Sequence, residues 1–264
     1  MYKRVIILGI DGAGNFVAQA ETPNIDKLFT DGAVTYNGVT SIPTISAECW
    51  GSMLLGVGPQ AHELTNEIVS DQPYDVDSPY PSIFRVVREA MPQAKLASFC
   101  NWDPINTGVI EENLGVAKFT ADNDAAICEQ ILAFLDAYDP TLVFVQFDEV
   151  DGAGHRYGYG KPEFLEKLTE IDRLIGKIVA KYREKGWAKD TLFIASADHG
   201  GNGQNDHGGD SPEEVLIFIG CAGYNVKKNV IKGMNVMDIA AVAATALGCK
   251  IPQTWLAKVP AELF

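Results

Sequence analysis

Five runs rich in apolar and β-branched residues recur along the chain, and each predicts a buried β-strand. They cover residues 4–10, 95–99, 141–147, 191–197 and 215–219. Helix-like segments lie between them and cover residues 23–29, 47–55, 83–90, 124–137, 162–185 and 237–247. Because strands alternate with helices, we predict an α/β fold with a mostly parallel central sheet and helices on both faces.

No linker-like segment or long-period repeat divides the chain. We therefore predict a single domain over residues 1–264, with a short candidate cap or insert around residues 63–140. No stretch approaches the roughly 18 apolar residues that a membrane-spanning helix needs. The apolar run after Lys3 and Arg4 is short, ends at Asp11 and lacks a cleavage site, so it does not predict a signal peptide. Five scattered cysteines predict reduced thiols, and we expect a cytoplasmic location.

The chain is acidic: 21 Lys and Arg residues against 35 Asp and Glu residues give a formal net charge of −14 over 264 residues. Non-specific binding of a nucleic-acid polymer needs clustered Lys and Arg, which this composition does not favour. An anionic membrane surface would repel such a chain. We therefore expect neither partner. The sequence makes no prediction of the oligomeric state.

Polar clusters follow the predicted strands where each one ends. Asp11 follows the first strand, Asp151 and His155 follow the third, and Asp198 and His199 follow the fourth. In open α/β sheets, ligands bind beyond the carboxyl ends of the strands. Three separate segments are therefore expected to bring carboxylates and imidazoles to one edge of the sheet.

Two glycine-rich segments carry residues of the types that bind metal ions. Asp and His are common ligands for Zn²⁺ and Mn²⁺, and the glycines between Asp151 and His155 are expected to let a loop fold back so that both meet one ion. Asp148 and Glu149 are alternative carboxylates. The tetrad Asp-His-Gly-Gly occurs at residues 198–201 and again at residues 206–209, which makes His207 a further ligand candidate.

Ser46 is a candidate nucleophile at the start of a predicted helix. Its alternative role is an N-cap, and Thr44 and Ser41 are rival hydroxyls on the same stretch. The N–H groups of a helix N-terminus attract phosphate oxygens. A neighbouring metal ion would lower the pKa of the serine hydroxyl. For His62, the fourth histidine, we expect a structural hydrogen bond and no metal.

Several of these motifs resemble the alkaline phosphatase superfamily, and within it the type I phosphodiesterase/nucleotide pyrophosphatase group. The resemblance covers nearly the whole chain. It rests on the order of Asp11, Ser46, Asp151/His155, Asp198/His199 and His207, and on segments 22–28, 56–62, 151–158, 207–214 and the helix from 237. The fold that the resemblance implies is alkaline-phosphatase-like.

The resemblance implies two divalent metal ions, usually zinc and sometimes manganese or magnesium. One ion would be held by Asp151, His155 and His207. The other would be held by Asp11, Asp198 and His199, with Ser46 approaching it. Ser46 would attack phosphorus, a phosphoserine intermediate would form, and water would hydrolyse it.

Departures from the motifs of related enzymes narrow the range of predicted activities. The Cys/Ser-x-Pro-x-Arg motif of sulfatases does not follow Ser46, which argues against a sulfatase. No arginine follows soon after Ser46, which favours diesters over the doubly charged monoesters. Glu48 would repel phosphate if it faced inward. Asn101 is predicted to donate to a phosphoryl oxygen, and Trp102 to stack on a base.

We thus predict a binuclear-metal phosphodiesterase or nucleotide pyrophosphatase that acts on a small phosphorylated substrate, with a nucleotide as one candidate. A phosphomonoesterase, or a phosphomutase or phosphotransferase of the same superfamily, is the alternative. A non-catalytic, metal-stabilised binding protein is a weaker hypothesis of a different class.

Overall fold

The computed structural model describes the backbone of residues 1–264 and all side chains except those at positions 229 and 230. Eight strands form one sheet in the order β4-β3-β5-β1-β6-β7-β2-β8. They are β1 (Arg4–Ile10), β2 (Ala33–Val39), β3 (Leu96–Cys100), β4 (Ala117–Thr120), β5 (Leu142–Phe147), β6 (Thr191–Ala197), β7 (Leu216–Ala222) and β8 (Asn229–Val230). Only β7 runs antiparallel to its neighbours. The predicted mostly parallel α/β sheet is confirmed.

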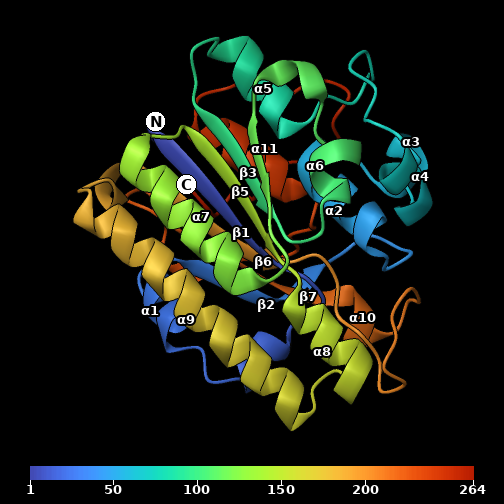
Figure 1. Ribbon diagram of the computed structural model, residues 1–264. Helices are drawn as coiled ribbons and strands as arrows, with labels where there is room; N and C mark the ends of the chain where they lie inside the picture. The colour runs from blue at the N-terminus through green and yellow to red at the C-terminus, as the bar shows by residue number, and fades with distance from the viewer.

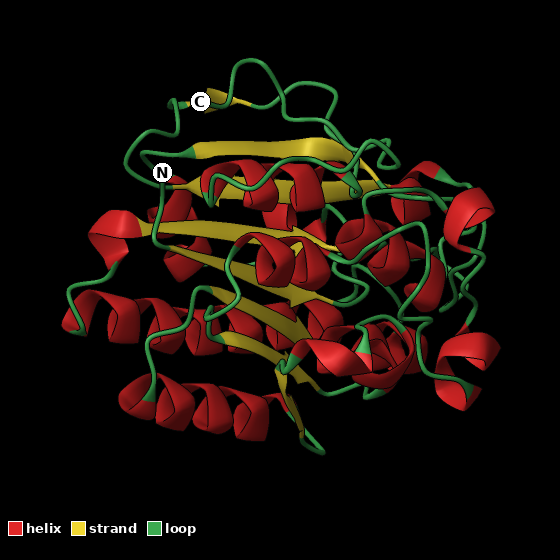
Figure 2. Cartoon of the chain, turned by 90° about the horizontal axis from the view of Figure 1, so that it is seen from above, coloured by secondary structure: helices red, strands yellow, loops and turns green.

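Helices cover both faces of the sheet (Figures 1 and 2). On one face α9 packs against α1, α7 and α8, and on the other α11 packs against α2 and α5. The α-helices are α1 (Pro23–Phe29), α2 (Ser46–Leu55), α3 (Pro59–His62), α4 (Asn66–Asp71), α5 (Ile83–Ala90), α6 (Pro104–Gly108), α7 (Asp124–Ala137), α8 (Glu149–Tyr157), α9 (Pro162–Glu184), α10 (Pro212–Val215) and α11 (Asp238–Ala246). Three short 3₁₀ helices are η1 (Phe16–Gln19), η2 (Glu112–Leu114) and η3 (Ala188–Asp190).

The centre of the sheet explains why the polar strand ends meet. Strand β1 lies between β5 and β6, and all three are buried along their whole length, as is usual for parallel strands covered on both faces. The last residue of β1 pairs with the last residues of β5 and β6. The next residues, Asp11, Asp148 and Asp198, therefore leave the sheet side by side.

The sequence did not predict β2, β4 and β8, nor the helix α8. Strand β2 alternates buried and partly exposed positions, so it lacks the continuous apolar run that marks the central strands. The most consequential error concerns α8: the glycine-rich segment from Asp151 to His155 is helical, and not a loop. Residues 63–140, predicted as a candidate insert, contain β3 and β4 of the central sheet.

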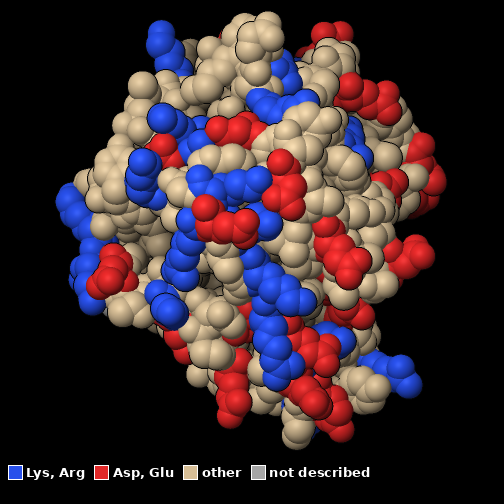
Figure 3. Space-filling view, turned by 60° about the vertical axis from the view of Figure 1, so that its left-hand side comes forward, with Lys and Arg blue, Asp and Glu red and all other residues tan. Residues whose placement is uncertain are grey.

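Charged side chains on the face seen in Figure 3 are interleaved by sign. Along α9, Lys181 pairs with Asp136 and Glu184, and Lys185 also pairs with Asp136. These lysines therefore form ion pairs with neighbouring carboxylates. No helix in the described part of the chain combines the length and the apolar character that crossing a bilayer requires.

Candidate metal centre and nucleophile

A buried cluster forms where β1 and β6 end. Ligand atoms of Asp11, Asp198 and His199 lie within 4.8 Å of one another. Asp11 is 2% exposed, and Asp198 and His199 are fully buried. The Nε2 atom of His199 lies 3.5 Å from Asp11 Oδ1 and 3.3 Å from Asp198 Oδ2. Two carboxylates and an imidazole thus converge in a space closed to water.

One oxygen of each buried carboxylate is satisfied and the other is not. Asp11 Oδ2 accepts hydrogen bonds from Trp50 Nε1 at 2.9 Å and Gln146 Nε2 at 3.0 Å. Asp198 Oδ1 accepts from the Gly12 backbone N–H at 3.1 Å. Asp11 Oδ1 and Asp198 Oδ2 have no hydrogen-bond partner. Burial, together with the neighbouring carboxylates, raises the pKa of Asp11 and Asp198 well above the ordinary range. The unpartnered oxygens and the raised pKa values therefore fit a site for a cation.

A second, more exposed cluster contains Asp151, His155 and His207, whose ligand atoms also lie within 4.8 Å of one another. Asp151 and His155 are one turn apart on α8, with His155 Nε2 3.1 Å from Asp151 Oδ2. His207 comes from the loop before α10, and its Nε2 lies 3.9 Å from Asp151 Oδ1. The sequence predicted that a folded loop would bring Asp151 and His155 together. A helix does so instead, because i and i+4 side chains share one face.

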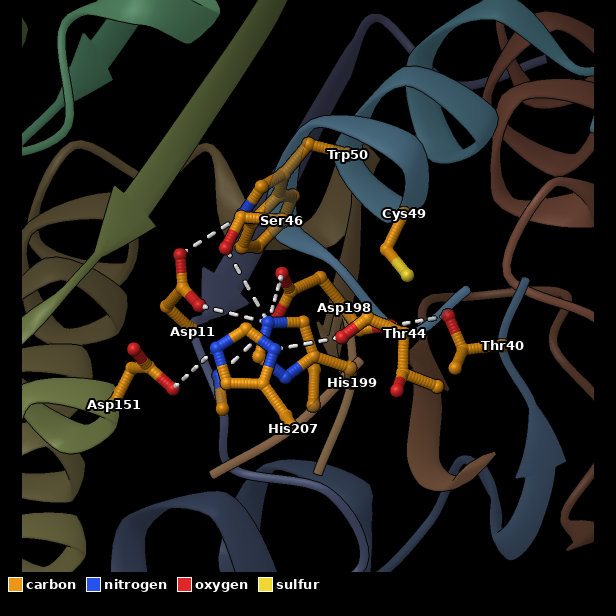
Figure 4. Close-up of polar contacts among 12 residues, drawn as sticks. Asp11, Thr40, Thr44, Ser46, Cys49, Trp50, Asp151, Asp198, His199 and His207 are labelled. Atoms are coloured by element: carbon orange, nitrogen blue, oxygen red, sulfur yellow. Dashed lines mark hydrogen bonds and ion pairs between the residues drawn. The ribbon is translucent and has the colours of Figure 1, made fainter. Parts of the chain in front are cut away.

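The two clusters adjoin one another (Figure 4). The imidazole rings of His199 and His207 stack with their centroids 4.0 Å apart. Gly12, at φ +66°, lies between the clusters: a Cβ there would be 2.4 Å from Asp151 Oδ1. Only a residue without a side chain can therefore occupy this turn while its N–H reaches Asp198.

All three histidines are oriented in the same way by a backbone carbonyl. The Nδ1 atoms of His155, His199 and His207 lie 3.0, 2.9 and 2.7 Å from the carbonyl oxygens of Asn205, Gly200 and Thr44 respectively. A carbonyl can only accept, so each Nδ1 carries the proton. Each Nε2 faces the carboxylates, and in the neutral imidazole this nitrogen offers the lone pair that a metal ligand needs.

Tyr159 contacts the exposed cluster through a hydrogen bond to Asp151. Its hydroxyl donates to Asp151 Oδ1 at 2.6 Å, and burial beside the Asp151 carboxylate raises the pKa of Tyr159. Its ring packs against Gly154 and Gly201, where a Cβ would come within 2.4 Å of the ring. The glycine at 154 is therefore needed for close packing inside a helix, which explains a sequence that seemed unsuited to one.

Ser46 lies at the first position of α2 and not at its cap, which is Ile45. Its Oγ is 3.4 Å from His199 Nε2, so the hydroxyl is turned toward the buried cluster (Figure 4). The rival hydroxyls are engaged elsewhere. Thr44 Oγ1 donates to the Gly209 carbonyl at 3.0 Å, and Ser41 Oγ donates to Ser52 Oγ at 2.8 Å. Only Ser46 of the three hydroxyls contacts a member of either cluster.

The N-terminus of α2 is less open to phosphate than the sequence suggested. The Ala47 N–H donates to Asn66 Oδ1 at 2.9 Å. Asn66 is exposed, and its amide nitrogen can only donate hydrogen bonds. The sequence reasoning missed Asn66, because nothing in its local pattern shows that α4 begins against α2.

Other predicted residues lie outside the two clusters. Asn101 Nδ2 donates to Asp124 Oδ1 at 3.1 Å, and the Trp102 N–H donates to Gln146 Oε1 at 2.9 Å. Neither has a contact with Ser46, and their substrate roles stay predictions. The expected structural role of His62 is confirmed: Nδ1 accepts from the Leu64 N–H at 3.0 Å, and burial lowers the pKa of His62 to about 4.

Trp50 and Gln146 are supporting residues that the sequence reasoning also missed. Both donate to Asp11, and each carried a signal in the sequence. Trp50 follows Ser46 by four positions and so lies on the same face of α2. Gln146 is the single polar side chain in the otherwise apolar strand β5. A buried polar residue in such a strand needs a partner, and here the partner is the ligand candidate.

Comparisons with known proteins identify a matching family model and several relatives. A family model described as type I phosphodiesterase/nucleotide pyrophosphatase matches residues 5–250. The human GPI ethanolamine phosphate transferase 3 catalytic subunit is 29% identical over 150 residues, which cover 55% of this chain and 13% of that protein. Human ectonucleotide pyrophosphatase/phosphodiesterase family member 7 is 22% identical over 233 residues, which cover 80% of this chain and 50% of that protein. The chain therefore spans half or less of the length of these two relatives.

Solved structures share the fold. Murine ectonucleotide pyrophosphatase/phosphodiesterase 5 superposes with a TM-score of 0.78 at 13% identity, over 99% of this chain and 100% of that one. A 2-O GAG sulfatase superposes with a TM-score of 0.80 at 13% identity, over 98% of this chain and 73% of that one. The architecture is thus alkaline-phosphatase-like. Within this class, the chain belongs to the type I phosphodiesterase/nucleotide pyrophosphatase family. The family suggested by the sequence motifs is confirmed.

Proposed function

We propose that this chain is a metal-dependent phosphodiesterase or nucleotide pyrophosphatase that uses Ser46 as its nucleophile. The observation that carries the proposal is the position of Ser46 Oγ, 3.4 Å from His199 Nε2, beside two buried carboxylate oxygens without partners. Membership in the family supports the reaction class. A nucleotide stays a candidate substrate; a solved structure of an inactive murine ectonucleotide pyrophosphatase/phosphodiesterase 5 contains AMP.

The donor set fits two divalent ions. A buried carboxylate oxygen without a partner costs about 1–3 kcal/mol, and Asp11 and Asp198 each have one. We propose that Asp11, Asp198, His199 and Ser46 hold one ion, and that Asp151, His155 and His207 hold the other. When bound, such ions supply positive charge that acidifies a hydroxyl and stabilises the oxygens of the reacting phosphate. The three histidine nitrogens among these ligands favour zinc, with manganese or magnesium as alternatives.

The residues of the chain account for the two displacements. Ser46 Oγ gives up its proton to solvent and forms a bond to phosphorus, and the bond from phosphorus to the leaving-group oxygen breaks with its electron pair on that oxygen. A water oxygen then attacks the phosphoserine, and the serine oxygen leaves and regains its proton. Trp50 and Gln146 keep Asp11 in place throughout, because both hydrogen-bond the oxygen that faces away from His199.

Asn66 is the protein donor best placed to hold the phosphate. Its Oδ1 accepts from the N–H of Ala47, the residue after Ser46, and its amide nitrogen carries two N–H donors. Within the described side chains, the ion pairs of Asp11, Asp151 and Asp198 involve only histidines, and no Lys or Arg joins them. A neutral amide in place of an arginine suits a diester, which carries one negative charge.

The test is replacement of the nucleophile. Ser46→Ala should reduce hydrolysis of bis(p-nitrophenyl) phosphate by the zinc-loaded protein to near background, because the covalent route is lost. Thr254→Ala, which removes an exposed hydroxyl outside both clusters and outside α2 and α4, is the matched control and should keep full activity. A Ser46→Ala protein that hydrolyses the diester at the wild-type rate would overturn the assignment.

A phosphotransferase is the second candidate, since one matched relative is named as an ethanolamine phosphate transferase. The same phosphoserine would then pass its phosphoryl group to an alcohol in place of water. Adding glycerol or ethanolamine to the reaction separates the two: a transferase forms the new ester in preference to the hydrolysis product. The cytoplasmic location inferred from the cysteines stays a prediction.

A further inference from the structure

Thr44 is a buried hydroxyl residue that the proposed chemistry does not use. Its side chain is fully buried, and it lies two residues before Ser46. The Oγ1 atom donates to the Gly209 carbonyl at 3.0 Å and accepts from the Gly208 N–H at 2.9 Å. A hydroxyl has one proton to donate, and here a backbone carbonyl accepts it. Thr44 is therefore placed to hold another segment of the chain, and not to attack a substrate.

The segment that Thr44 holds is the loop of residues 202–209, which carries His207. The backbone carbonyl of Thr44 accepts from His207 Nδ1 at 2.7 Å, so the same residue orients the imidazole of this ligand candidate (Figure 4). Three hydrogen bonds to one residue thus fix three consecutive residues of the loop. A ring held in this way keeps its Nε2 atom directed at Asp151 Oδ1, 3.9 Å away.

The same loop reaches the other histidine of the exposed cluster. The Asn205 carbonyl lies 3.0 Å from His155 Nδ1 and accepts its proton. Gly209, at the end of the loop, is bound from two sides: its N–H donates to Glu214 Oε1 at 2.9 Å, and its carbonyl accepts from Thr44. A shift of the loop would therefore disturb both histidines of the exposed cluster together.

We propose that Thr44 is a positioning residue that holds the exposed cluster at a fixed place relative to the nucleophile. Ser46 faces the buried cluster, whereas His207 belongs to the exposed one, so the chain must fix the distance between them. Thr44 does so because it is two residues from Ser46 along the chain and hydrogen-bonded to the loop of His207. The inference rests on the proposed function, because it concerns the alignment of the same centre.

The test removes the hydroxyl and keeps the shape of the side chain. Thr44→Val leaves two backbone groups of the loop without their partner, so the loop shifts. The affinity for one of the two zinc ions should fall about tenfold, as measured by competition with a chromophoric chelator. With both zinc sites saturated, kcat for bis(p-nitrophenyl) phosphate should fall about tenfold and KM should stay within about twofold, because alignment is lost and substrate binding is not.

Two further variants separate this role from a loss of stability. Thr44→Ser keeps the hydroxyl and should keep the zinc affinities and the kcat of the wild type. Thr191→Val removes an equally buried hydroxyl, which donates to the Trp187 carbonyl at the opposite end of β6 from Asp198. It should lower the free energy of unfolding and leave the zinc affinities and kcat unchanged. Wild-type zinc affinities and kcat in Thr44→Val, or the same losses in Thr191→Val, would overturn the proposal.

A measurement on the wild-type protein needs neither a variant nor turnover. In metal-free protein, the Gly208 N–H, which donates to Thr44, should exchange with solvent at least about tenfold more slowly than the N–H of Gly203, an exposed residue of the same loop. Equal exchange at the two glycines would contradict the proposal, because a loop that opens freely cannot fix His207. Wild-type protein that binds two zinc ions and hydrolyses no phosphodiester would contradict the proposed function alone, and the zinc affinities of Thr44→Val would still decide the role of Thr44.

Discussion

The two ligand clusters are built differently. The cluster of Asp11, Asp198 and His199 stands on the ends of central strands and is closed to water. The cluster of Asp151, His155 and His207 stands on a helix and a loop, and all three of its members are partly exposed or exposed. In the first, two carboxylate oxygens have no partner, whereas in the second Asp151 is paired with His155 at 3.1 Å.

The charges of the exposed cluster balance one another without a metal ion. The hydrogen bond from His155, with the nearby histidines, outweighs burial and lowers the pKa of Asp151 to about 2. The same bond raises the pKa of His155 to about 9. The buried cluster has the opposite character, since burial raises the pKa of both its carboxyl groups. This difference indicates that the buried cluster gains more from a bound cation than the exposed cluster does.

The largest expected effect is an opposite response to loss of charge in metal-free protein. Asp198→Asn should raise the free energy of unfolding by about 1–3 kcal/mol, because it removes an unpaired buried charge and its amide can donate to His199 Nε2. Asp151→Asn should lower it by about 1 kcal/mol, because it breaks the pair with His155. Urea unfolding in the presence of a chelator measures the free energy of unfolding of both variants. Two changes of the same sign would contradict the difference between the clusters.

A smaller effect should follow from removing the support of the exposed cluster. Tyr159→Phe deletes the hydroxyl that donates to Asp151 Oδ1 and keeps the ring that packs against Gly154 and Gly201. The loss of this hydrogen bond should lower the affinity for one of the two zinc ions by roughly 10-fold. Competition with a chromophoric chelator measures the two affinities separately. If the two zinc affinities fall equally, or neither falls, Tyr159 does not act specifically on the exposed cluster.

Sequence and structure agree best where the chemistry is tied to strand ends. Asp11 and Asp198 could be placed together because parallel strands deliver their ends to one edge of the sheet. The helix at Asp151 could not be predicted from its local sequence, because its two glycines disfavour a helix. Packing against the Tyr159 ring requires one of these glycines, and Tyr159 lies eight residues after Asp151.

Long-range contacts account for the other misses. Asn66 and Tyr159 gain their roles only because α4 begins beside α2 and because the Tyr159 ring packs between two glycines. Neither arrangement leaves a periodic pattern in the sequence. Gln146 did leave one, as a lone polar side chain in a buried strand, and it could have been proposed as a partner for a ligand.

Two divalent ions are proposed to occupy these clusters beside Ser46. Anomalous diffraction at the zinc absorption edge, from crystals of the zinc-loaded protein, tests this proposal most directly. We predict two peaks, one bounded by Asp11, Asp198, His199 and Ser46 and the other by Asp151, His155 and His207. The absence of a peak between Asp11 and Asp198, where the unpaired oxygens lie, would contradict the account.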